Sequence, residues 1–66
     1  MNADDLAPAR ITEKARQTII NGLRVAAEQY RHDAQTMHAH SQPRLAAQFE
    51  RQAAEAEQVA AELEDL

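Results

Sequence analysis

The chain has 66 residues, with seven Lys and Arg against eleven Asp and Glu and a formal net charge of −4 at pH 7. This length allows one small domain, and the acidic balance argues against a general nucleic-acid binder, which would show a basic excess. Cysteine is absent, which excludes disulfides and thiolate metal sites. We expect a single domain over 1–66 with a flexible N-terminus over 1–8.

Hydropathy and the N-terminal sequence bear on the compartment. No apolar run approaches the ~20 residues that a membrane-spanning helix needs. The first ten residues, MNADDLAPAR, lack the basic and apolar regions of a signal peptide. We therefore expect a soluble, cytoplasmic protein with no membrane contact.

The first predicted helix covers residues 9–39. Thr12 is a candidate N-cap, with Glu13 in the following turn. Apolar residues recur at steps of four, four and three, at Ala15, Ile19, Leu23, Ala26, Tyr30, Ala34 and Met37. This eleven-residue repeat predicts a nearly straight or slightly right-handed course. Asn21-Gly22 is a turn signal that could break the helix, but the unbroken apolar phase favours one long helix.

The second predicted helix covers residues 43–65. Ser41 or Gln42 would cap it, because the residue before Pro43 resists the helical conformation. Its apolar positions follow a heptad seam at Leu45, Phe49, Gln52, Ala56, Val59, Leu63 and Leu66. Gln52 is the one polar member. It either fixes register or oligomeric state at some cost in stability, or lies at the edge of the seam in water.

The short connection between the two helices predicts an all-α, antiparallel two-helix hairpin. Folding the chain between Ala39 and His40 places Tyr30 opposite Phe49. The apolar arc on each helix is wider than a two-helix contact needs, so we expect a homodimer that forms a four-helix bundle. The residues expected to support this self-association are Ile20, Leu23, Ala27, Tyr30, Phe49, Gln52, Ala56, Val59 and Leu63.

The three histidines, His32, His38 and His40, raise the question of a metal site. His38 and His40 are about 200° apart on a helix, and no H-E-x-x-H or Glu-x-x-His pattern accompanies them. The sequence also lacks a nucleophile motif and a glycine-rich phosphate loop. We expect no metal, no cofactor and no enzymatic activity, and interpret the histidines as solvated residues near the hairpin tip. In a dimer, symmetry could bring histidines of the two copies together, and a mild pH dependence of the dimer would then follow.

Two functions remain in view. The first is a small adaptor or inhibitor that binds protein through an alanine-rich helical face and an acidic C-terminal end. The carboxylates of that end are Glu55, Glu57, Glu62, Glu64 and Asp65. The alternative is a Rop-like dimeric bundle that binds RNA or DNA through a sparse basic stripe on the first helix, formed by Arg10, Lys14 and Arg31. That stripe has no interleaved aromatic residue for base stacking.

Overall fold

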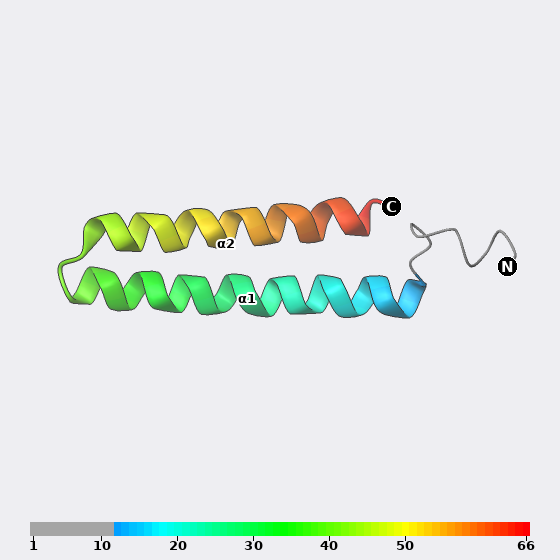
Figure 1. Ribbon diagram of the computed structural model, residues 1–66, viewed down its shortest axis with the longest axis horizontal. Helices are drawn as coiled ribbons and strands as arrows, with labels where there is room; N and C mark the ends of the chain where they lie inside the picture. The colour runs from blue at the N-terminus through cyan, green and yellow to red at the C-terminus, as the bar shows by residue number, and fades with distance from the viewer. Residues whose placement is uncertain (1–11) are drawn as a thin grey trace, which may run out of the picture.

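The computed structural model describes residues 12–66 as two α-helices, α1 (Glu13–Ala39) and α2 (Pro43–Glu64). The helices run antiparallel and lie side by side along their length (Figure 1). The predicted all-α hairpin is thereby confirmed. The predicted start of the first helix at residue 9 and the proposed flexible segment 1–8 lie outside the described residues.

α1 begins where the sequence predicts a cap and continues without a break. The Thr12 hydroxyl Oγ1 accepts a hydrogen bond from the Ala15 backbone N–H at 3.1 Å, which satisfies one of the donors left free at a helix start. The helix passes through Asn21 and Gly22. A Cβ added at Gly22 would meet nothing within 4 Å, so packing inside the hairpin does not require glycine there.

The turn between the helices is a Schellman motif, the commonest way of ending a helix on a left-handed residue. The Gln42 N–H donates to the Met37 carbonyl at 2.8 Å, and the Ser41 N–H donates to the His38 carbonyl at 3.1 Å. Ser41 has φ 58°, in the left-handed region that glycine usually occupies. Pro43 then opens α2 in its first turn, where its missing N–H costs nothing.

Alanine forms most of the buried seam between the helices. The buried side chains are Ile20, Ala27 and Ala34 on α1, and Ala46, Ala53, Ala56 and Ala60 on α2. All the buried alanines except Ala56 recur at intervals of seven on their helix, which is the spacing of a coiled coil. Such small side chains let two helix axes approach closely.

The predicted seam is right at about half of its positions, including Tyr30, Phe49 and Ala56, and lies one residue off at the others. The predicted seam residues Ile19, Leu45 and Val59 are 42%, 43% and 43% exposed, whereas Ile20, Ala46 and Ala60 are buried. The eleven-residue repeat predicted for the first helix is therefore replaced by a heptad. The prediction assigned the seam to the largest apolar side chains, but close packing of two helices favours the row of small ones.

The predicted register is confirmed at both ends of the hairpin. Tyr30 and Phe49 stack with ring centroids 6.4 Å apart and planes 24° apart. At the open end, Arg16 Nη1 donates to the backbone carbonyls of Leu63 at 2.9 Å and Glu64 at 3.4 Å. The positive charge of this guanidinium also interacts favourably with the negative, C-terminal end of the α2 dipole.

Candidate protein-interaction surface

A flank borders the seam on each side of the hairpin, and each flank consists of one row of residues from α1 and one from α2. In an antiparallel coiled coil, each row faces the matching row of the neighbouring helix. We define the ion-pair flank by its three cross-helix contacts: Arg24–Glu64, Arg31–Glu57 and His38–Glu50. Arg31 Nη2 lies 2.9 Å from Glu57 Oε2, and His38 Nε2 lies 3.0 Å from Glu50 Oε1. The contacts recur every seven residues on both helices, so the polar groups of this flank are engaged with each other.

The central pair of this flank has a measurable electrostatic signature. Arg31 Nη1 donates to Glu57 Oε1 at 3.0 Å, and this hydrogen bond, with the guanidinium charge, lowers the pKa of Glu57 below its ordinary value. The same hydrogen bond and the carboxylate charge raise the pKa of Arg31. Both groups are therefore ionised at neutral pH and engaged with each other.

A groove of about 370 Å³ lies on the ion-pair flank. It is lined by Arg31, Ala34, Gln35, Glu50, Ala53 and Ala54. The groove exists because alanines stand where larger side chains would fill the space between the helices. Arg31 and Glu50 already have ionic partners in the hairpin, so the lining gathers neither a nucleophile with a base nor a set of metal ligands.

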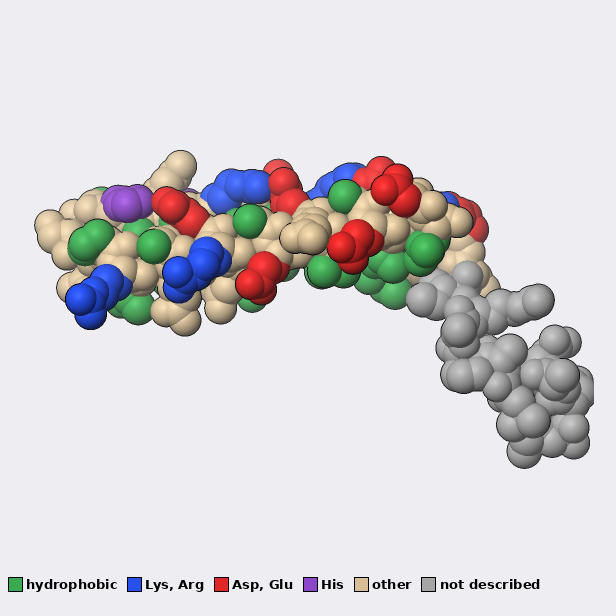
Figure 2. Space-filling model, turned by 90° about the horizontal axis from the view of Figure 1, so that it is seen from above, with side chains coloured by type: hydrophobic (Ala, Val, Ile, Leu, Met, Phe, Trp, Pro, Cys, Tyr) green, Lys and Arg blue, Asp and Glu red, His purple; other side chains and the backbone are tan. Residues whose placement is uncertain are grey.

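The opposite row has a different composition, and we call it the apolar flank. It consists of Ile19, Ala26, Asp33, His40, Leu45, Gln52, Val59 and Leu66. Leu66 is 86% exposed, and the other three large apolar members are just over 40% exposed. Hydrophobic side chains gather along one long edge of the molecule, most of all near the C-terminal end of α2 (Figure 2).

Large side chains next to the apolar flank are incompletely covered. A row of half-buried residues borders it: Leu23, Tyr30, Met37, Phe49 and Leu63. Among the eleven large apolar residues of segment 12–66, only Ile20 is fully buried. The hairpin thus leaves most of its large apolar side chains open on one side, which is typical of an interaction surface.

The predicted self-association residues divide into two groups. Ile20, Ala27 and Ala56 are buried in the seam and hold the two helices together. The other six, from Leu23 to Leu63, are half-buried or exposed and border or belong to the apolar flank. The predicted set omitted Ile19, Leu45 and Leu66, although the sequence places Leu45 and Leu66 in the heptad row of Val59 and Ile19 in the apolar stripe of the first helix.

The acidic end is partly neutralised within the hairpin. Of its five predicted carboxylates, Glu57 and Glu64 face Arg31 and Arg24 in ion pairs. Glu55, Glu62 and Asp65 are exposed. The surface that this end offers to a partner is therefore less acidic than the sequence suggests.

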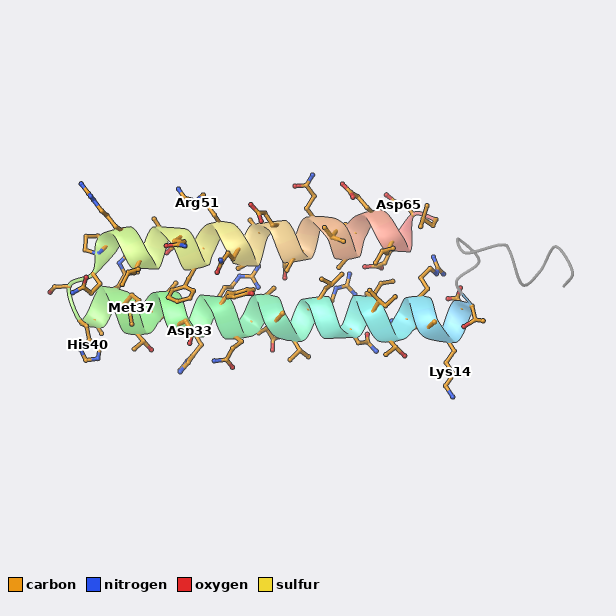
Figure 3. All side chains as sticks on the ribbon, in the orientation of Figure 1. Lys14, Asp33, Met37, His40, Arg51 and Asp65 are labelled. Atoms are coloured by element: carbon orange, nitrogen blue, oxygen red, sulfur yellow. The ribbon has the colours of Figure 1, made fainter. Side chains whose placement is uncertain are left out.

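The basic stripe of the alternative function is not gathered into one patch in the described part of the chain. Arg10 lies outside the described residues. Lys14 is exposed and its side chain points away from α2 (Figure 3). Arg31 is paired with Glu57. Of the three predicted contacts, only Lys14 is a described cation with an unshared charge.

The histidines and the membrane prediction can be placed as well. His38 contacts Glu50, and His40 lies at the tip (Figure 3). Within residues 12–66, no group of three His, Asp or Glu side chains is arranged to hold a metal ion. Neither α1 nor α2 combines the length and hydropathy of a membrane-crossing helix.

The exposed and half-buried apolar side chains of one flank offer surface that could be buried against another chain. Comparison with known proteins adds no relative to this picture. No protein-family model, curated protein or solved structure matches the chain significantly. A functional assignment therefore rests on the geometry of the two flanks.

Proposed function

We propose that this protein is a non-enzymatic protein-interaction module, an adaptor or inhibitor that self-associates and docks through the apolar flank. One observation carries the proposal: the flank exposes Ile19, Val59 and Leu66 beside a half-buried apolar row, while the other flank carries two Arg–Glu ion pairs and a His–Glu contact. Burying apolar surface releases about 25 cal/mol per Å². A chain seated on this flank would also cover the half-buried row and enlarge the small alanine core.

The carboxylates of the acidic end would steer a partner's association and contribute less to affinity than the apolar flank does. Glu55 and Glu62 lie on α2 beside the apolar flank, and Asp65 ends the helix. Charges at the rim of an interface steer association and exclude wrong partners more than they hold a complex together. We propose that the module acts in the cytoplasm.

The Rop-like nucleic-acid function has weaker support. Arg24 and Arg31 are bound to Glu64 and Glu57, so phosphate would have to displace an internal carboxylate from each. Retention of RNA or DNA that falls steeply with salt, and is lost in a Lys14→Glu, Arg31→Glu variant, would favour this alternative.

A matched pair of valine substitutions tests the proposal. Val59 lies on the apolar flank, whereas Val25 is 66% exposed on the outer side of α1. By sedimentation equilibrium, we expect the wild-type chain and Val25→Glu to show twice the 7.4 kDa chain mass. Val59→Glu should associate at least ~10-fold more weakly, because it buries an unpaired charge.

Circular dichroism is the control for folding, and all three chains should keep the same helical signal. A wild-type chain that remains at 7.4 kDa at millimolar concentration would refute self-association. A protein partner isolated from cells and bound equally by the wild-type chain and Val59→Glu would refute docking through the apolar flank.

A further inference from the structure

The apolar flank is built in layers. We match each residue of α1 in this flank with one residue of α2 by their heptad order. The layers, from the open end to the tip, are Ile19 with Leu66, Ala26 with Val59, Asp33 with Gln52, and His40 with Leu45. Three layers contain apolar residues, and the third contains two polar residues that are half-buried in the single hairpin.

We infer that a second copy of this chain covers the flank, related by a two-fold axis parallel to the long direction of the hairpin. This inference rests on the proposed function and specifies its geometry. Under such an axis, α1 of one copy lies on α2 of the other, and both tips are at the same end. All neighbouring helices are antiparallel, as in an up-down four-helix bundle.

This axis makes the flank complementary to itself. Each layer keeps its height, so Ala26 meets Val59 of the second copy and Ile19 meets Leu66 of the second copy. In the Ala26 layer a small side chain faces a larger one, as in the interdigitated layers of a packed core, and in the Ile19 layer two large apolar side chains meet. The interface is isologous, so every such contact occurs twice.

The polar layer gains partners from the same arrangement. Within one hairpin, the Asp33 carboxylate accepts a long hydrogen bond from Gln29 Nε2 at 3.3 Å. In the dimer, Asp33 meets Gln52 of the second copy, whose side-chain amide can donate two hydrogen bonds. A single polar layer between apolar layers fixes the register of packed helices, which gives Gln52 a specific role.

Repulsion between like charges disfavours a perpendicular axis centred on Val59. A two-fold axis across the helices, centred on Val59, would lay α2 on α2 and bring Glu55 of one copy to Glu62 of the other, twice. It would also place Ile19 against Asp33 of the second copy. Like charges brought together at an interface oppose association. Under the proposed axis, Glu55 meets the uncharged Gln29 and Glu62 meets Gly22 of the second copy.

Single cysteines distinguish the two axes, because the chain contains no cysteine of its own. We would mix equal amounts of Ala26→Cys and Val59→Cys chains in a glutathione redox buffer and resolve the disulfide-linked dimers by mass. The proposed axis predicts the mixed dimer in clear excess over the half that random pairing gives. A mixture of Val25→Cys with Val59→Cys is the matched control, since Val25 lies on the outer side, and it should pair at random.

The outcomes separate this inference from the proposed function. An excess of the two homodimers would overturn the long axis and leave the apolar flank as the dimer surface. Random pairing indistinguishable from the Val25→Cys control, with a wild-type mass of 7.4 kDa, would overturn the second copy as occupant. The flank would then be assigned to a different protein, and the Val59→Glu comparison with an isolated partner decides that question.

Discussion

The two flanks of this hairpin are built on the same two helices and differ in almost every property. The ion-pair flank carries Arg24 and Arg31 against Glu64 and Glu57, and a groove beside alanines. The apolar flank carries Ile19, Leu45 and Val59, each more than 40% exposed. The comparison teaches that a two-helix chain can engage the charges of one side with each other and leave large apolar side chains exposed on the other.

The cause of this difference lies in how the seam divides small and large residues. Of the two heptad positions that form the seam, one holds Ala27, Ala34, Ala46, Ala53 and Ala60. The other holds larger side chains, including Tyr30 and Phe49, which stack on each other. The alanine position borders the ion-pair flank, and the larger position borders the apolar flank. Close approach at the alanines therefore leaves the larger residues half-covered.

The largest expected effect comes from breaking the alanine seam that both flanks share. Ala53 is 2% exposed, whereas its neighbour Ala54 is exposed. Ala53→Leu forces extra volume between closely packed helices and should lower the free energy of unfolding by about 1–3 kcal/mol. Urea unfolding followed by circular dichroism measures this loss.

Ala54→Leu is the matched control and should change stability by less than ~0.5 kcal/mol. Equal losses in the two variants would mean that the helices are not held by the alanine row. In that case the exposed Leu45 and Val59, rather than Ala46 and Ala60, would have to form the seam, and the two flanks would exchange roles.

The sequence predicts the fold well because helix propensity, the cap at Thr12 and the proline at position 43 are local signals. It predicts the register from the level of Tyr30 and Phe49. It places about half of the seam one residue off, because a hydrophobicity count ranks Val59 above Ala60, while the distance between two helices is set by tertiary packing. The ion pairs could not be predicted without the correct seam, because the seam decides which residues of the two helices face each other on its flanks.

A smaller effect concerns Ser41 in the turn, a residue that belongs to neither flank. Ser41 adopts φ 58°, a conformation that costs a residue with a Cβ about 1–2 kcal/mol and glycine almost nothing. Ser41→Gly should therefore raise the free energy of unfolding by about 1 kcal/mol. Because it touches neither flank, the dimer dissociation constant, corrected for folding, should not change.

Thermal unfolding and sedimentation equilibrium on the same samples test both parts of this expectation. A Ser41→Gly chain that is less stable than the wild-type chain would contradict the Schellman turn. If stability rose but association weakened, the tip would have to be part of the docking surface, and the separation of tip and apolar flank would be wrong.

The smallest effect is a pH dependence of the ion-pair flank. The hydrogen bond from Arg31 lowers the pKa of Glu57 from its ordinary value of 4.5. A carboxyl whose pKa is lower in the folded state stabilises the fold fully above its unfolded pKa, and this contribution is lost as the pH falls through the folded pKa. The difference in melting temperature between the wild-type chain and Glu57→Gln should therefore be constant near neutral pH and shrink below about 4.5.

Glu55→Gln removes the same charge from an exposed residue that lies beside the apolar flank, so its difference from the wild-type chain should vary less across this range. Molar salt should also reduce the Glu57→Gln difference, because exposed charges are screened. Profiles of the same shape for the two variants would show that net charge, rather than the Arg31–Glu57 contact, stabilises the hairpin. The ion-pair flank would then be solvated like any other surface, and the apolar flank alone would distinguish the two sides.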